Sequence, residues 1–227
     1  MKHIIILLFG VLSLANCLAQ GLNPTDQLAL LKGVVTNFKG KPLANEIIMF
    51  SDDKTKTLVK VHTDASGKFE VLIPVKATYS LKYKNFATDV DYTKMTVPAD
   101  KNATYEVKIM IDPPKDYVLD NVYFETGKST LKASSYKALD DLVEVLKLKS
   151  AMAIEIQGHT DNVGKEEDNM KLSQDRANEV RKYLTSKGID ATRIAAKGYG
   201  ATMPIADNNS EAGKAKNRRT SLKVLKE

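Results

Sequence analysis

The sequence is poor in the residues that most often build covalent cross-links and metal centres. It contains one cysteine, Cys17, and three histidines. A single cysteine cannot form a disulfide within the chain, and loss of the segment that carries it leaves no thiol chemistry. A catalytic zinc needs three protein ligands, but His159 has only Asp161 nearby, and His62 lies in a different part of the sequence. The sequence therefore disfavours zinc chemistry.

Long apolar runs are also scarce, and the one at the N-terminus is typical of a signal peptide. Lys2 precedes the apolar run Ile4–Ala15, and the short exit segment after this run ends in "LAQ". This run is too short to span a bilayer comfortably. A basic start, a short apolar run and small residues before the cleavage site predict a signal peptide over residues 1–19, cleaved after Ala19.

The segment around Cys17 also leaves a second form of export open. A lipobox, the signal for lipid attachment, is resembled by the four residues Leu14, Ala15, Asn16 and Cys17. Asn16 is, however, larger than the residue normally found before a lipidated cysteine. The predicted signal peptide carries one basic residue, Lys2, and no acid, so its removal lowers the formal net charge from +6 to +5. An exported protein of this charge meets polyanionic envelope polymers and not nucleic acid, although a generally solvated surface explains the charge alone equally simply. Export predicts a location in the periplasm and cell envelope, associated with the outer membrane.

Strand patterns follow one another between Leu30 and Ile111. They comprise "LKGVVTN", "ANEIIMF", "KVHTD", "FEVLIP", "YSLKY" and "TYEVKIMI", with turn residues between them. Phe69, Val71 and Ile73 alternate with polar positions, which is the period of a half-buried strand. We therefore predict an antiparallel β-sandwich over residues 20–112.

The stretches "GVVTNFKGKPLANEIIMF" and "TDASGKFEVLIP" make this region resemble the carboxypeptidase-regulatory or transthyretin-like sandwich family. The resemblance implies a fold and an accessory module of exported proteins, and it implies no chemistry. It leaves open that the sandwich contacts an outer-membrane or envelope protein.

Asp112–Pro114 marks a boundary, because two prolines cannot continue a strand ladder. After it the pattern changes from successive strands to strands that alternate with helices. Ser134 or Ser135 is suited to cap the first helix that follows, and Gly188 suits the end of the second. The predicted strands are "YVLDNVYFE", "MAIEIQGH", "RIAAKGYG" and "RTSLKVL", the predicted helices are "SSYKALDDLVEVLKLK" and "EEDNMKLSQDRANEVRKYLTSKG", and "NNSEAGKAK" adds a short helix or turn. This order predicts a two-layer α/β domain over residues 113–227, with the pattern βαβαββ and a mixed sheet.

Charged groups at two places in this domain point to ligand binding. Asn169, Leu172 and Arg176 fall at helical spacing on one stripe, where an arginine in line with apolar residues is unusual. One explanation is that Arg176 extends to solvent or forms a structural ion pair with a nearby carboxylate. The preceding strand and loop bring Asp161 towards the N-terminus of the same helix. Asp161 and Arg176 together would bind a zwitterion, the carboxylate taking an ammonium group and the guanidinium a carboxylate.

Hydrolytic chemistry finds less support in the sequence. Ser173, His159 and Asp161 are the residue types of a catalytic triad, but Ser173 lies within a predicted helix with no nucleophile-elbow motif around it. A metal-dependent wall hydrolase remains an alternative that predicts bound zinc.

Five stretches in order make residues 113–227 resemble the OmpA C-terminal-like domain of outer-membrane proteins, Pal lipoproteins and flagellar stators. They are "VYFETGKSTL", "IEIQGHTDNVG", "NMKLSQDRANEVRKYLTSKGI", "RIAAKGYGATMPIADN" and "AKNRRTSLKV". The resemblance implies non-covalent binding of peptidoglycan through the diaminopimelate of its stem peptide, with no enzyme activity, cofactor or metal. A stator would need a transmembrane helix, which the sequence lacks.

Carried over by position, the resemblance implies that Asp161 and Arg176 contact diaminopimelate. It further implies a pocket made with the residues Thr160, Asn162, Asn169, Leu172 and Arg218. Arg218 is preferred over Arg219 because neighbouring strand residues point to opposite faces and its parity matches Leu222 and Val224. One departure is Gly127, where many relatives have Asn or Asp, and which removes a side chain from this edge of the site. An envelope scaffold that acts mainly through the sandwich stays open as an alternative.

Overall fold

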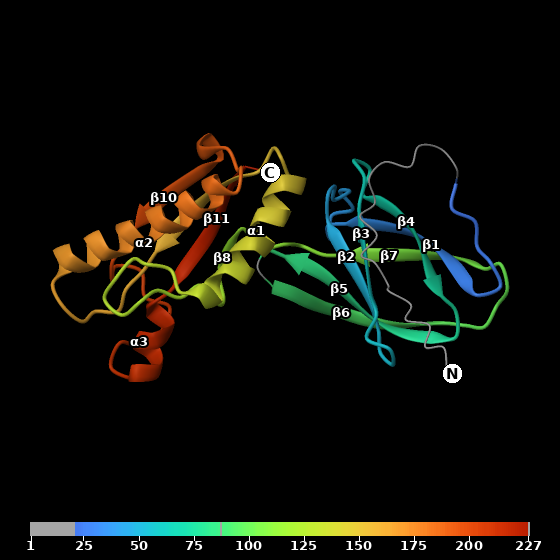
Figure 1. Cartoon of the computed structure of the whole chain (residues 1–227), viewed down its shortest axis with the longest axis horizontal. Coiled ribbons are helices and arrows are strands. Elements are labelled where there is room, and N and C mark those ends of the chain that lie inside the picture. Colours follow the sequence, from blue (N-terminus) through green and yellow to red (C-terminus); the bar gives the residue numbers. More distant parts are fainter. Residues whose placement is uncertain (1–20, 87, 227) are drawn as a thin grey trace, which may run out of the picture.

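The computed structural model describes residues 21–86 and 88–226 (Figure 1). The predicted signal peptide and the alternative lipid attachment at Cys17 lie outside these residues. Within the described ranges, no helix has the length and apolar character needed to cross a membrane. The N-terminal strands form one end of the molecule, and the longer helices with the C-terminal sheet form the other (Figure 1).

The N-terminal region contains two sheets that share one hydrophobic core. Their strand orders are β4-β1-β7 and β3-β2-β5-β6. The strands are β1 (Leu28–Thr36), β2 (Ile47–Asp52), β3 (Leu58–His62), β4 (Lys68–Pro74), β5 (Ala77–Asn85), β6 (Thr88–Val97) and β7 (Thr104–Met110). Phe69 and Ile73 on β4 are buried and their neighbours Lys68 and Glu70 are exposed, as the alternating sequence predicts. This period of two places one face of the strand in the core.

Two features of this region differ from the prediction. The pairing is not purely antiparallel, because β1 and β7 run parallel, with Gly33 opposite Val107. Alternation of apolar residues has the same period in both kinds of pairing, so it does not encode strand direction. Strand β6 was not predicted, because it is an edge strand with mostly exposed positions and therefore lacks apolar alternation. The resemblance to the carboxypeptidase-regulatory or transthyretin-like family stays a prediction.

The C-terminal region is built on a mixed sheet, as predicted, and its strand order is β10-β9-β11-β8. β10 runs parallel to β9, whereas β11 is antiparallel to both β9 and β8. The elements are β8 (Asp116–Val118), α1 (Tyr136–Leu148), β9 (Ala153–Gly158), α2 (Glu166–Ser186), β10 (Ile194–Gly198), α3 (Glu211–Asn217) and β11 (Thr220–Lys226), with 3-10 turns at Ala133–Ser135 and Ala191–Arg193. Leu142 on α1, Val180 on α2 and Ile156 on β9 are each 0% exposed and belong to one core.

The first predicted strand of this region is shorter than expected. "YVLDNVYFE" was predicted as a strand, but β8 ends at Val118. Asn121 has a left-handed φ of 63°, which breaks an extended ladder, and Phe124 makes only an isolated bridge to Leu131. The chain from Leu119 to Lys132 is therefore mainly loop, and it passes the edge of the candidate site described below.

Of the two predicted capping positions, the one at Gly188 agrees with the structure and the one at Ser134 or Ser135 does not. Gly188, with φ of 91°, lies just past the end of α2. The structure adds a cap that was not predicted, because the hydroxyl of Ser210 accepts the N–H of Gly213 at the start of α3. Ser135 precedes α1, but its hydroxyl instead accepts the N–H of Tyr123 at 2.8 Å and donates to the carbonyl of Tyr123 at 2.9 Å. The prediction of a serine side-chain cap for α1 is wrong, because the long loop before the helix takes the hydroxyl.

The two regions also share buried contacts, through α1 and strand β2 (Figure 1). Ile48 and Phe50 face the core of the N-terminal sheets, whereas Ile47 and Met49 belong to the core of the C-terminal region. The rings of Phe86 and Tyr117 pack edge to face with centroids 4.4 Å apart. Ion pairs cross the same boundary from Lys60 to Glu144 at 3.7 Å, from Lys84 to Asp141 at 3.1 Å and from Lys149 to Glu46 at 2.6 Å. Strand β2 is therefore buried on both faces, which fixes how the two regions are joined.

Candidate functional site

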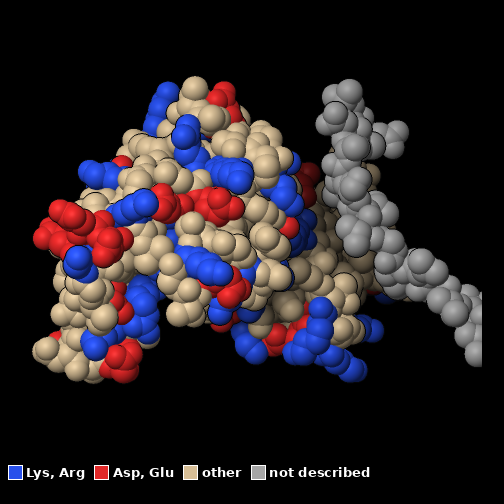
Figure 2. Space-filling view, turned by 60° about the vertical axis from the view of Figure 1, so that its left-hand side comes forward, with Lys and Arg blue, Asp and Glu red and all other residues tan. Residues whose placement is uncertain are grey.

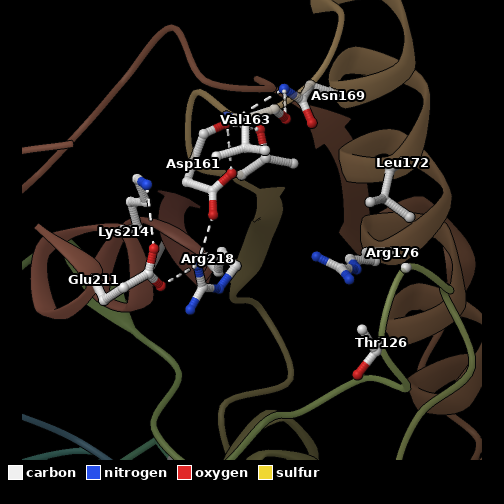
Figure 3. Close-up of a pocket in the computed structure, with 11 residues that line it drawn as sticks. Thr126, Asp161, Val163, Asn169, Leu172, Arg176, Glu211, Lys214 and Arg218 are labelled. Atoms are coloured by element: carbon white, nitrogen blue, oxygen red, sulfur yellow. Dashed lines mark hydrogen bonds and ion pairs between the residues drawn. The ribbon is translucent and has the colours of Figure 1, made fainter. Parts of the chain in front are cut away.

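A pocket opens where the loop after β9 meets the N-terminal half of α2 and the short helix α3 (Figure 3). Its volume is about 430 Å³. The lining residues are Thr126, Gly127, Thr160, Asp161, Val163, Asn169, Leu172, Arg176, Glu211, Lys214 and Arg218. Segments far apart in the sequence thus converge on one charged cavity.

Two glycines allow α2 to lie close to the sheet beneath this pocket. A Cβ atom on Gly158 would come within 2.1 Å of the carbonyl oxygen of Ser173, and one on Gly198 within 2.4 Å of the backbone nitrogen of Gln174. Both distances are far below van der Waals contact, so only glycine permits this approach. The end of β9 and the first turns of α2 are consequently held together, and this brings Asp161 to the helix.

Asp161 is positioned by its own loop and by α2. Its Oδ1 accepts the backbone N–H of Val163 at 3.0 Å. The side-chain amide of Asn169 donates to the carbonyl oxygens of Asp161 at 3.4 Å and Val163 at 3.0 Å, so the loop is tied to the helix. Thr160 turns its hydroxyl onto the same loop, where it donates to the carbonyl of Asp161 at 2.9 Å. The carboxylate is thereby directed into the pocket (Figure 3).

An arginine at the end of α3 already contacts this carboxylate. Nη1 of Arg218 is 2.6 Å from Oδ2 of Asp161. Burial raises the pKa of Asp161, but the hydrogen bond and charge of Arg218, the N–H of Val163 and the charge of Lys214 outweigh it, so the pKa lies below its usual value. Asp161 is therefore ionised at neutral pH and is paired with Arg218.

Arg176 stands across the pocket from Asp161, and its guanidinium points into the cavity (Figure 3). Its Nε donates to the carbonyl of Lys128 at 3.1 Å, and its Cζ lies 5.1 Å from the centre of the Phe124 ring. Among the residues that the structure describes, no carboxylate lies within ion-pair distance of it. Burial and the nearby charge of Arg218 lower the pKa of Arg176, and the charge of Asp161 opposes them. A guanidinium at this position remains charged and can bind an anion.

The structure brings together six of the seven residues that the sequence assigned to the site. Thr160, Asp161, Asn169, Leu172, Arg176 and Arg218 line the pocket, whereas Asn162 is exposed and lies outside its lining. Arg218 and not Arg219 faces Asp161, because Arg219 instead donates to the carbonyl of Met203 at 3.0 Å. Asp161 and Arg176 face one cavity, as expected of a pair that binds a zwitterion. The structure differs from this expectation in one respect, because Arg218 already forms an ion pair with the carboxylate of Asp161.

Sequence reasoning missed Thr126, Val163, Glu211 and Lys214 as lining residues, and Gly127 was noted only as a departure. Glu211, Lys214 and Arg218 follow the spacing i, i+3 and i+7, which is the same signal that placed Asn169, Leu172 and Arg176 on one stripe. Applied to "SEAGKAKNRR", that spacing would have found the second charged wall.

The geometry does not support a catalytic or metal-binding role for His159. His159 is 1% exposed, its Nε2 lies 2.9 Å from Oγ of Ser221, and burial with the nearby Arg219 lowers its pKa to about 4. Ser173 donates to the carbonyl of Met170 at 2.8 Å and accepts the N–H of Gly200 at 2.9 Å, so it is not aligned with the histidine as a nucleophile. Within the described residues, no three histidine, cysteine or carboxylate side chains are grouped as a metal site.

Surface charge outside the pocket does not form a single basic field on the face seen in Figure 2. Lysine and arginine side chains are interspersed with aspartate and glutamate there, with one concentrated acidic area. A mixed surface of this kind gives weak long-range attraction, so recognition on this face depends on local geometry.

Comparison with known proteins shows which family this chain is similar to. The family model described as "OmpA family" matches residues 123–218. The "Peptidoglycan-associated lipoprotein" of Buchnera aphidicola is 30% identical, over 74% of this chain and 98% of that protein. "Outer membrane porin F" of Pseudomonas fluorescens is 41% identical over 46% of this chain, which spans only 32% of the porin.

Among solved structures, the peptidoglycan-associated lipoprotein from Burkholderia pseudomallei is 30% identical with a TM-score of 0.44. The match covers 49% of this chain and 91% of that structure.

Proposed function

The chain belongs to the OmpA family, and from this premise we propose that it binds peptidoglycan non-covalently in the cell envelope. The proposed ligand is the diaminopimelate of the stem peptide. The proposed role is that of a periplasmic anchor associated with the outer membrane, without enzyme activity. One observation carries the proposal, namely that Arg176, which has no carboxylate partner among the described residues, faces the carboxylate of Asp161 across one pocket.

Diaminopimelate carries an ammonium and a carboxylate at the free end of its side chain, and the pocket has one group for each. Asp161 accepts hydrogen bonds from the ammonium, and Arg176 donates hydrogen bonds to the carboxylate. Both contacts are charge-assisted, because donor and acceptor are ionised. The partial burial of both groups strengthens these contacts, because the local dielectric is lower than that of water. Removal of either partner leaves a partly desolvated charge alone, which costs affinity.

The remaining lining residues supply shape and support. Leu172 provides an apolar wall for the methylene groups of the ligand. Asn169 and Thr160 act through the loop that they fix, and Arg218 holds Asp161 while the pocket is empty. Asn162 is exposed and lies outside the pocket lining, so we expect it to contact only a peptidoglycan fragment that extends beyond the pocket.

We further propose residues 1–19 as a signal peptide, residues 20–112 as a β-sandwich and residues 113–227 as the peptidoglycan-binding domain. The buried contacts of β2 and α1 support the sandwich as a spacer with a fixed orientation. Its outer strands are the surface on which an envelope or outer-membrane protein would bind. A role as a wall hydrolase is disfavoured by His159, which is buried, neutral and hydrogen-bonded to Ser221.

A pull-down with purified diaminopimelate-type sacculi tests the proposal. The wild-type protein should sediment with the sacculi, and Asp161→Ala and Arg176→Ala should each reduce the bound fraction by at least about tenfold. Asp175→Ala and Lys182→Ala remove the same charges from exposed positions of α2 outside the pocket and serve as matched controls. If both pocket variants sediment as well as the two controls, the proposed site is wrong.

A further inference from the structure

Arg218 lies between two carboxylates on the α3 wall of the pocket (Figure 3). Its Nη1 is 2.6 Å from Oδ2 of Asp161 and 4.0 Å from Oε2 of Glu211. The other oxygen of Glu211, Oε1, lies 3.1 Å from Nζ of Lys214. The guanidinium therefore has one short ion pair and a second carboxylate within reach.

The short ion pair occupies the carboxylate that a ligand ammonium needs. Oδ1 of Asp161 already accepts the N–H of Val163, and Oδ2 faces Arg218. An ammonium group that arrives at Oδ2 meets a guanidinium of the same sign, and the two repel at this range. Binding at Asp161 is most favourable after Arg218 has moved away.

Arg218 has room to move without opening the core. Its side chain is 42% exposed and that of Glu211 is 79% exposed, whereas that of Asp161 is only 11% exposed. A long, partly hydrated arginine changes rotamer on a much shorter timescale than a packed core rearranges. The nearest carboxylate that can receive it is Glu211.

We propose that Glu211 is a positioning residue that takes Arg218 from Asp161 when a ligand ammonium enters the pocket. This exchange rests on the proposed function and deepens it. In the empty pocket Arg218 neutralises Asp161, which avoids an unpaired, partly buried carboxylate. In the occupied pocket the ligand ammonium replaces Arg218 at Asp161, and Arg218 pairs with Glu211.

The exchange has a consequence for specificity. A stem peptide whose free end lacks an ammonium group offers Asp161 no cation, so Arg218 stays in place and narrows the pocket. The site therefore selects a cationic end by internal competition as well as by direct attraction.

Calorimetric titration with a soluble stem peptide that ends in diaminopimelate tests this exchange. Glu211→Gln should weaken binding by about fivefold, the scale of one exposed ion pair. In an Arg218→Gln background, adding Glu211→Gln should not change the affinity further, because Glu211 then has no guanidinium to pair with. With the same peptide acetylated on its terminal amine, Glu211→Gln and the wild-type protein should bind alike. Glu179→Gln changes the net charge equally on α2 outside the pocket and is the matched control.

Two results overturn the exchange alone. One is binding by Glu211→Gln that equals or exceeds that of the wild type. The other is a loss in Arg218→Gln as large as the loss in Arg176→Ala, because Arg218 would then contact the ligand directly. If the wild-type protein does not bind the peptide, or binds it equally well without Asp161 and Arg176, the proposed function fails and the exchange fails with it.

Discussion

Two ion pairs in this molecule have the same length and different surroundings. Lys149 and Glu46 join the two regions at 2.6 Å with side chains 19% and 5% exposed, whereas Arg218 and Asp161 meet in the pocket at 2.6 Å with 42% and 11% exposed. Arg218 also has a second carboxylate, Glu211, at 4.0 Å. The two pairs therefore have the same length but differ in solvent access and in the presence of an alternative partner, and these two differences are what the proposed exchange of Arg218 requires.

The interface pair is also embedded in apolar contacts that the pocket pair lacks. Ile47, Met49 and Phe86 are at most 5% exposed and belong to the core that contains α1. Burial of a side chain such as Met49 contributes about 2 kcal/mol. Glu46 and Lys149 are thus held in place from both sides, and the angle between the two regions is fixed with them.

Removing one partner of the interface pair should have the largest effect. Lys149→Met leaves the carboxylate of Glu46 buried without a cation, and we expect a loss of about 3 kcal/mol in the free energy of unfolding. Urea denaturation measures this loss. Adding Glu46→Gln should restore most of it, since a neutral amide needs no counterion. Equal stabilities of wild type and Lys149→Met would contradict the structural role of the pair.

Acid should weaken the fold through His159, which lies beneath the pocket. Burial and the nearby charge of Arg219 lower its pKa to about 4 in the folded protein, from the ordinary value of 6.5 for histidine, so the unfolded chain binds the proton more tightly. Stability is therefore full above about pH 6.5 and is lost as the pH falls towards 4, by about 2 kcal/mol between pH 7 and pH 5. Denaturation across this range should show a shallower slope in His159→Gln than in the wild type. An unchanged slope would exclude His159 as the group responsible, and His62→Gln, at an exposed position, serves as the control.

Substitution of Gly127, at the rim of the pocket, should have an intermediate effect on the stability of the protein. Its φ is 67°, and a Cβ atom there meets nothing within 4 Å, so conformation and not space limits substitution. Gly127→Asn should cost about 1 kcal/mol at most, whereas the β-branched Gly127→Val should cost more, because asparagine tolerates the left-handed region better. Thermal denaturation of the two variants compares them. Equal midpoints would show that the loop relaxes around either side chain.

The pocket pair should have the smallest effect on stability. Arg218→Gln removes a cation whose side chain is 42% exposed, while the carboxylate of Asp161 keeps the N–H of Val163 and the nearby charge of Lys214, so we expect a loss of less than about 1 kcal/mol. The same urea denaturation that is used for Lys149→Met gives the direct contrast. A loss as large as in Lys149→Met would mean that both pairs are structural.

Local patterns predicted most of the C-terminal fold, because its helices and inner strands carry strong periodic signals. The acidic start of α2 and Gly188 after its end marked the helix within a few residues. Strand β6 escaped prediction because it is a polar edge strand, and the pairing of β1 with β7 has no local signature. The run "IIMF" in β2 is apolar at consecutive positions, which is the mark of a strand buried on both faces and a missed sign of the interface.

The site was predictable where its residues share a helix and less so where they do not. Asn169, Leu172 and Arg176 were found by spacing on α2. The contact between Asp161 and Arg218 spans 57 residues of sequence and depends on how α3 packs against the loop after β9. Spacing alone cannot show that an arginine already occupies the carboxylate, because this requires the distance between two separate walls.

The most direct test of the central claim is a calorimetric comparison of two soluble stem peptides, one ending in diaminopimelate and one in lysine. Both carry the ammonium for Asp161, and only diaminopimelate carries the terminal carboxylate for Arg176. We predict that the wild-type protein binds the diaminopimelate peptide at least about tenfold more tightly, and that Arg176→Ala loses this preference. Equal affinity of the wild-type protein for both peptides would contradict recognition of a zwitterion by Asp161 and Arg176.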